Sequence, residues 1–416
     1  MKRDDASMRA VRQGGWWRYA ARPAMALSLI AGAACAASPG GWNDAFRHPE
    51  FPERTAPAGT YPWVEPDDPS AVKVSAADGL MNAVVVGDVI VVADRVKSVP
   101  AGSTGALGVR VRGVDPAGHT LFTGPTMAAE SGQSDGPRLH LIGDGPELRV
   151  AFAYHKTGPG GRFSYADFYD PSARGHVRPR TVRFPTDEQL EWAGDTAFQG
   201  ALLDDGGPIT ILDADGTLSR WHRPGWLPVA ATGDVVVDAH RGNDSRHQGF
   251  EVVDRRTGRV LWSGRGQTVY AVSTKAIIAG YTRRLVLSEL RTGKVIARGN
   301  DPLSSGGTPS DADGTRQQGD LITTWQVAGS TRHRWVHGGW NAGYYAIWKD
   351  DLYGFQSPGN PMDDNPMALW IPSTGVPHRF PVTGKAAPLG VTSDGHAVAL
   401  TGTVRGYSLY VLPLRR

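Results

Sequence analysis

Polar side chains that could bind a ligand or transfer protons gather in three segments that are rich in Gly, Asn, Asp and Pro. These segments are 154–162, 239–248 and 355–366. Histidine and carboxylate groups can act as acids and bases, and Lys, Arg and Asn donate hydrogen bonds. Loops on a rigid scaffold commonly carry binding groups, although such loops can also be merely solvated. The candidate binding residues are His155, Lys156, Arg162, His240, Arg241, Asn243, Asp244, His247, Asp363 and Asp364.

Recognisable catalytic motifs are scarce. Gly132-Gln133-Ser134-Asp135-Gly136 has the spacing of a nucleophile elbow, which needs a strand before it and a helix after it. Here a loop rich in Ser and Gly surrounds the match and Pro137 follows it, so we interpret it as a chance match. No His-Glu-x-x-His or Cys-x-x-Cys spacing occurs. The sequence therefore identifies no reaction, and it predicts no metal site and no cofactor.

The elements that must position the three segments are short strands. After residue 70, runs of Val, Ile, Leu, Tyr and Trp alternate with Gly, Asp, Asn and Pro, which is typical of strands joined by turns. One series of turns follows a strand that usually ends in an acidic residue, and it recurs roughly every 42 residues. Its clearest positions are Asp115, Asp170, Asp213, Asp254, Glu289 and Ile371. We expect the three polar segments to follow the second strand of such units, as long loops around a central channel on one face.

A second series of turns opens a strand and interleaves with the first. Its turns start at Gly87, Asp144, Gly194, Gly233, Thr274, Gly319, Asp350 and Asp394. A four-stranded unit buries both faces only against neighbours on both sides, so a ring of such units must close. We therefore predict an all-β fold, a β-propeller with eight four-stranded blades. Seven blades remain an alternative because the copy around Gly329 is weak, and the strand at 71–75 is expected to close the ring.

One repeat carries a full motif, Val252-x-Asp254-x-x-Thr257-Gly258-x-x-x-Trp262. This motif resembles the blade motif of PQQ-like, or quinoprotein-type, β-propeller repeats. The resemblance implies the fold more than an activity, since such repeats occur in dehydrogenases, assembly lipoproteins and sensors. The dehydrogenases of this type hold their cofactor beside a disulfide between adjacent cysteines. Cys35 is the only cysteine here, so that arrangement is impossible.

The N-terminal part is typical of an export signal. Residues 1–34 combine a basic stretch with a short apolar run, 23–34, that is too short to span a bilayer. Cys35 follows directly, in a context that resembles a lipoprotein cleavage box, so we expect lipidation at Cys35. The alternative is an Ala-x-Ala cleavage site around Cys35. Residues 35–70, rich in Pro and Gly, are expected to tether the propeller domain, 71–416, and their aromatic residues suggest that part of the tether lies against the domain.

The charge of the chain is carried by its leader. Residues 1–34 hold six Lys or Arg against two Asp, whereas the whole chain has a formal net charge of +3. The domain is therefore close to neutral, and nothing in its composition favours nucleic-acid binding. We predict an exported protein, lipid-anchored on the outer face of the cytoplasmic membrane or secreted, that binds a protein or cell-envelope component as a non-catalytic scaffold. The alternatives are a propeller lyase or hydrolase acting on a glycan or small molecule, and a PQQ-dependent oxidoreductase.

Overall fold

The fold was analysed in a computed structural model of the protein. The described residues all lie within one compact unit, Phe46–Arg416. They are 56–57, 59–75, 80–96, 107–130, 137–143, 145–186, 190–193, 196–199, 208–240, 249–272, 275–281, 284–299, 322–326, 333–337, 342–349, 351–356, 367–371, 378–380, 386–403 and 406–416. The export signal, Cys35 and most of the tether therefore lie outside the described residues.

Short strands dominate the structure, and the described residues contain no α-helix. The exception to the strands and turns is a 3-10 helix, η1 (Gly145–Glu147). No helix in the described ranges has the length and apolar content needed to cross a membrane.

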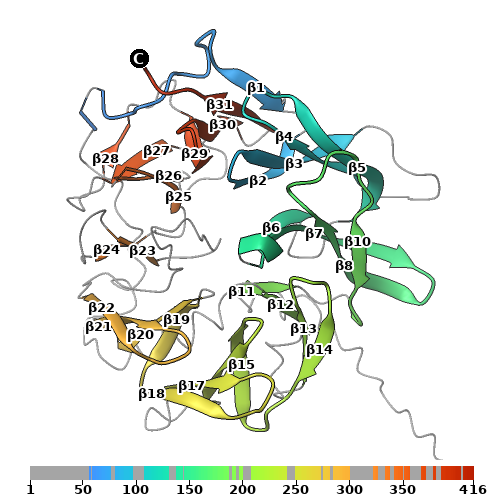
Figure 1. Ribbon diagram of the computed structural model, residues 1–416, viewed down its shortest axis with the longest axis vertical. Coiled ribbons are helices and arrows are strands. Elements are labelled where there is room, and N and C mark those ends of the chain that lie inside the picture. Colours follow the sequence, from blue (N-terminus) through green and yellow to red (C-terminus); the bar gives the residue numbers. More distant parts are fainter. Residues whose placement is uncertain are drawn as a thin grey trace, which may run out of the picture. The chain divides into compact units, whose positions relative to one another are not determined.

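The strands form eight sheets in the described part of the chain, which we number in chain order (Figure 1). Sheet 1 contains β2 (Leu80–Val86), β3 (Val89–Val96), β4 (Leu107–Val114), β5 (Thr120–Ala129) and β9 (Gly175–His176). Sheet 2 contains β6 (Arg138–Ile142), β7 (Arg149–Gly158), β8 (Gly161–Tyr169) and β10 (Arg180–Arg183). Sheet 3 contains β11 (Glu191–Ala193), β12 (Thr196–Gln199), β13 (Ile209–Leu212) and β14 (Leu218–Trp221). Sheet 4 contains β15 (Trp226–Ala231), β16 (Val235–His240), β17 (Gly249–Asp254) and β18 (Val260–Arg265).

The remaining sheets follow the same antiparallel plan. Sheet 5 contains β19 (Thr268–Val272), β20 (Ala276–Tyr281), β21 (Arg284–Glu289) and β22 (Val295–Gly299). Sheet 6 contains β23 (Ile322–Gln326) and β24 (His333–His337). Sheet 7 contains β25 (Ala342–Trp348), β26 (Asp351–Gln356), β27 (Met367–Ile371) and β28 (His378–Arg379). Sheet 8 contains β29 (Ala387–Val391), β30 (Ala397–Thr403), β31 (Gly406–Leu412) and β1 (Val72–Ser75).

Apolar side chains fill the space between neighbouring sheets wherever the structure describes the side chains of both. Val91, Phe122 and Phe152 pack between sheets 1 and 2, and further clusters join sheets 2 to 3, 3 to 4, 4 to 5 and 7 to 8. A cluster that includes Ile90 and Val398 joins sheet 8 to sheet 1. Four-stranded sheets that stack in chain order, with the last against the first, make a β-propeller. The number of blades stays a prediction, because the side chains of sheet 6 lie outside the described ranges.

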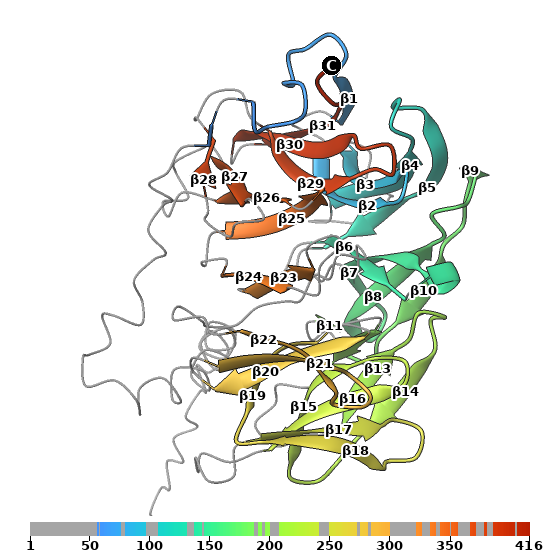
Figure 2. The same ribbon diagram turned by 60° about the vertical axis from the view of Figure 1, so that its left-hand side comes forward.

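The strand at 71–75 behaves as the sequence predicts. β1 pairs antiparallel with β31, with Val72 opposite Val411, and both views show the two strands together (Figures 1 and 2). It thereby supplies the outer strand of sheet 8. Ser75 Oγ also donates to Asp94 Oδ1 of β3 at 2.6 Å. One strand therefore ties sheet 8 to sheet 1.

The residues before β1 also pack against the sheets at the point where the ring closes. Tyr61 and Trp63 are buried against sheets 7 and 8, and the Trp63 indole N–H donates to the carbonyl oxygen of Gly395 at 2.8 Å. Arg415 Nε donates to the Trp63 carbonyl oxygen at 2.7 Å. Part of the predicted tether thus lies against the domain.

Candidate functional site

The first polar segment is a hairpin rather than the long loop predicted from the sequence. β7 runs to Gly158 and β8 starts at Gly161, so only a two-residue tip separates them. Gly160 and Gly161 have φ values of 94° and 121°, which favour glycine and let the chain reverse within so few residues. His155 and Lys156 therefore lie on β7, and Arg162 lies on β8.

The other predicted site residues are placed only in part. His240 is the last residue of β16. Outside the described residues lie Arg241, Asn243, Asp244, His247, Asp363 and Asp364, together with the lipidation candidate Cys35. Their roles as binding or lipidation sites stay predictions.

All three polar segments follow the second strand of a sheet, as predicted. They connect β7 to β8, β16 to β17 and β26 to β27. Because neighbouring strands are antiparallel, these connections leave the sheets on one side. The two series of turns leave on the other side. We call these the second-strand side and the turn side.

On sheet 2, the second-strand side is organised by Glu130. Its carboxylate accepts hydrogen bonds from the Thr157 backbone N–H at 3.0 Å and from Thr157 Oγ1 at 2.8 Å. Arg162 Nε lies 3.6 Å from Glu130 Oε2, and both side chains are about a quarter exposed. The backbone of Glu130 pairs with that of His155. Glu130, which the sequence did not single out, therefore fixes the hairpin that carries three candidate residues.

A second polar contact lies behind this hairpin, between sheets 2 and 3. The Ser164 Oγ of β8 lies 3.3 Å from His155 Nδ1, and Gln199 Nε2 of β12 donates to Ser164 Oγ at 3.4 Å. Ser164 and Gln199 are buried. A histidine next to a serine could suggest an activated nucleophile, but the buried hydroxyl is not open to a substrate. The contact positions the His155 ring.

On sheet 4, the second-strand side holds a buried carboxylate, Asp238 of β16. Its Oδ1 accepts a hydrogen bond from the Trp221 indole N–H at 3.3 Å, and its side chain is completely inaccessible. Burial raises the pKa of Asp238 to about 6, against the lowering effects of Trp221 and Arg223. Asp238 therefore titrates close to neutral pH.

Arg223 connects this carboxylate to the surface. Its Nη1 lies 3.7 Å from Asp238 Oδ2, and its Nη2 lies 2.5 Å from Oε2 of Glu251. The guanidinium stacks on the Trp226 ring, 4.3 Å from the ring centroid, and the His240 ring meets Trp226 edge-on at 5.1 Å. Arg223 is about a quarter exposed. Two carboxylates and an aromatic ring thus hold one cation in place, and His240 lies beside it.

The chemistry of this cluster favours binding over proton transfer. Asp238 and Glu251 share one guanidinium, and a carboxylate with a raised pKa can act as a general acid. However, the Asp238 carboxylate does not reach solvent, whereas Arg223, Trp226 and Glu251 do in part. In the described part of the chain, no group of three His, Cys, Asp or Glu side chains could hold a metal ion.

Sequence reasoning missed most members of this cluster. Trp221 reaches across from sheet 3, where its indole N–H donates to Asp238 of the next sheet. The signal for Asp238 is its position in the run Val235-Val236-Val237-Asp238, where an acidic residue interrupts an otherwise apolar strand. A carboxylate at such a position must be paired or protonated. Arg223 and Glu251 carry no comparable signal.

Comparisons with known proteins add little. No protein-family model matches the sequence, and no curated protein matches it. A crystal structure of glucose dehydrogenase aligns over 83% of this chain and 100% of its own, with 13% identity and a TM-score of 0.34. The WD40 domain of SCAP from fission yeast aligns over 83% of this chain and 98% of its own, with 6% identity and a TM-score of 0.40. The β-propeller assignment therefore rests on the sheets of the protein itself.

Proposed function

We propose that the protein is an exported, lipid-anchored β-propeller with PQQ-like repeats that binds a protein or cell-envelope component without catalysis. The partner docks on the second-strand side. The anchor is Cys35, and the function is that of a scaffold at the outer face of the cytoplasmic membrane.

The observation that carries this proposal is the fixed position of Arg223. Its guanidinium is stacked on Trp226 and paired with Glu251 in front of the buried Asp238, so it loses little conformational freedom when a partner binds. Arginine and tryptophan are the residue types that most often dominate protein interfaces. Arg162 and Glu130 form a similar partly exposed pair on sheet 2. The second-strand side thus presents ordered cationic and aromatic groups from two sheets.

Site-specific photo-crosslinking in cells tests which side is used. The crosslinking amino acid would replace Lys156 or His240 on the second-strand side, and Arg259 or Lys294 on the turn side as controls. All four residues are exposed. We expect one discrete adduct, of the same mass, from Lys156 and His240 and none from the controls. Adducts from the turn-side positions alone, or equally from all four, would overturn the proposed docking side.

Metabolic labelling with a fatty-acid analogue tests the anchor. The wild-type chain should carry the label and sediment with membranes, and the Cys35→Ser variant should do neither. Labelling of the variant at the same level would exclude Cys35 as the lipidation site.

The alternative of a propeller enzyme draws on one observation, the pair formed by Asp238 and Glu251 around Arg223. In such an enzyme Glu251 would meet the substrate, because it is the more exposed carboxylate. Turnover of a glycan or small molecule by the purified protein, abolished in Glu251→Gln, would replace the binding proposal.

A further inference from the structure

Sheet 2 departs from the regular repeat at the connection between its third and fourth strands. In sheet 4 the corresponding turn runs directly from Asp254 to Val260. After β8, by contrast, the chain crosses to the outer edge of sheet 1, where β9 pairs in parallel with β5, and it then returns as β10. The Val177 N–H donates to the carbonyl oxygen of Thr123 at 3.0 Å, which fixes this detour.

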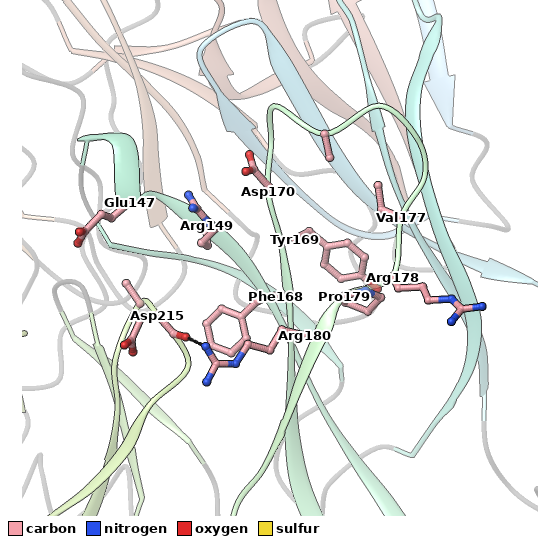
Figure 3. Close-up of a pocket in the computed structure, with 12 residues that line it drawn as sticks. Glu147, Arg149, Phe168, Tyr169, Asp170, Val177, Arg178, Pro179, Arg180 and Asp215 are labelled. Carbon is pink, nitrogen blue, oxygen red and sulfur yellow. Dashed lines mark hydrogen bonds between the residues drawn. The ribbon is translucent and has the colours of Figure 1, made fainter.

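The detour borders a pocket of about 670 Å³ on the turn side. This volume is within the range of small-molecule sites. The rings of Phe168 and Tyr169, at the end of β8, form part of its wall (Figure 3). The pocket is also lined by three basic and three acidic side chains, which are Arg149, Arg178, Arg180, Glu147, Asp170 and Asp215.

Two of the acidic side chains are occupied by their own turns. Asp170 Oδ1 accepts hydrogen bonds from the backbone N–H and the hydroxyl of Ser172, at 2.8 and 2.7 Å. Asp215 accepts from the backbone N–H and the hydroxyl of Thr217, both at 2.8 Å. These hydrogen bonds hold the pKa of each carboxyl below its ordinary value. Each carboxylate is therefore bonded to its own turn, while its charge also attracts an arginine at longer range, Asp170 attracting Arg149 and Asp215 attracting Arg180.

The arginines are bound differently, because their described hydrogen bonds go to neutral carbonyl groups. Arg149 Nη1 donates to the carbonyl oxygens of Pro146 and Leu148, at 3.0 and 2.8 Å. Arg180 donates to the carbonyl oxygens of Asp215 and Gly216 in sheet 3. A carbonyl orients a guanidinium without neutralising its charge. Both arginines lie on the Phe168 side of the pocket, whereas the guanidinium of Arg178 points away from them (Figure 3).

We infer that this pocket binds a small organic anion, with its carboxylate at Arg149 and Arg180 and an aromatic or apolar body against Phe168. The geometry that supports this is the position of two oriented cations beside the Phe168 ring, in a pocket that the detour through β9 borders. Charge-assisted hydrogen bonds from arginine to a carboxylate are among the strongest in proteins. This site is separate from the second-strand side, so it does not depend on the proposed function.

Isothermal titration with a panel of aromatic monocarboxylates, beginning with phenylacetate, tests the inference. Phenylacetamide has nearly the same shape without the charge, so it is the matched neutral probe. We expect phenylacetate to bind at millimolar concentration and phenylacetamide to bind about tenfold more weakly. Arg149→Met and Arg180→Met should each weaken phenylacetate binding about tenfold. Arg149→Lys, which keeps the charge, should reduce the affinity for phenylacetate by a smaller factor. Arg259→Met, in the corresponding turn of sheet 4, is the control and should bind as the wild type does.

Circular dichroism separates loss of binding from loss of folding. Arg180 contacts the turn of sheet 3, so a folding defect in Arg180→Met would leave Arg149→Met as the deciding variant. Absence of binding across the panel overturns the inference. Equal affinity for phenylacetate and phenylacetamide also overturns it, as does wild-type affinity in the folded arginine variants.

Discussion

The indole N–H of Trp262, on the outer strand of sheet 4, donates to the carbonyl oxygen of Leu290 in sheet 5 at 2.7 Å. The ring also covers Gly293, where an added Cβ would lie 2.7 Å from Trp262 Cδ2. Gly293 has a φ of 68°, in the region that favours glycine. Trp262 of sheet 4 thus packs directly on the Thr292-Gly293 turn of sheet 5.

The contact between Trp262 and Gly293 predicts that two similar glycine substitutions will destabilise the protein to different degrees. Gly258 has a φ of 70° and nothing within 4 Å of an added Cβ, so Gly258→Ala should lower the free energy of unfolding by only about 1 kcal/mol. Gly293→Ala has the same backbone strain and also meets Trp262, so it should cost about 1–3 kcal/mol more. Urea denaturation of the two variants measures the difference. In a Trp262→Ala background, the additional destabilisation by Gly293→Ala should disappear. Equal losses of unfolding free energy at the two glycines would contradict the proposed contact between Trp262 and Gly293.

An ion pair across sheets 3 and 4 predicts strong coupling between its partners. Arg255 donates to both carboxylate oxygens of Asp213, and these side chains are 12% and 24% exposed. A double-mutant cycle with Arg255→Ala and Asp213→Ala should give a coupling free energy of about 1–3 kcal/mol. Arg291 and Asp234 form an exposed pair, 49% and 73%, so the same cycle there should give less than about 1 kcal/mol. Equal coupling free energies in the two cycles would show that burial does not determine the strength of these ion pairs.

Asp238 predicts a pH-dependent stability. Its folded pKa of about 6 is above the ordinary value of 3.8, so the folded state binds the proton more tightly than the unfolded state. The resulting stabilisation is complete below pH 3.8 and is lost as the pH rises through 6. Relative to wild type, Asp238→Asn should gain up to about 3 kcal/mol in free energy of unfolding between pH 4 and pH 7. The comparison needs denaturation curves of both proteins at each pH, and a constant difference would rule out titration of Asp238.

Trp63 predicts that the segment before β1 is part of the folded domain. Trp63 is fully buried and hydrogen-bonded to Gly395, so Trp63→Ala should lower the free energy of unfolding by about 3–5 kcal/mol. Asp67→Ala, at an exposed position of the same segment, should change it by less than about 0.5 kcal/mol. Thermal and urea unfolding provide the measurement. Equal, small effects would mean that residues 56–70 act only as a tether.

The regular part of the fold could be predicted because it depends on local chemistry. Asp254 Oδ1 accepts hydrogen bonds from the backbone and hydroxyl of Thr257, and Gly258 supplies the positive φ that completes the turn. Such turns leave the same residue types in each repeat, so their spacing reveals the strands. The pairing of β1 with β31 could be predicted because the last unit lacked a strand and 71–75 offered one.

The candidate sites depend on contacts that no local pattern encodes. Arg223 precedes β15 in a short connection, and its partners Asp238 and Glu251 lie on two different strands. The detour through β9 places two residues on the edge of sheet 1, although the flanking strands belong to sheet 2. Two residues are too few to produce a periodic pattern in the sequence. The hairpin at 154–162 was misjudged because its glycines suggest a loop as readily as a tight turn. Side-chain positions between sheets follow from register, which spacing alone does not determine.

The pairing of β1 with β31 has a consequence for the order in which the protein folds. Among the described strands, β1 is the first and β31 the last, so their contact closes a loop that contains all the others. Contacts of such long sequence separation form late and slow the folding of β proteins. During synthesis, sheet 8 stays incomplete until β31 has been made. The ring can therefore close only after residues 406–412 have joined the rest of the fold.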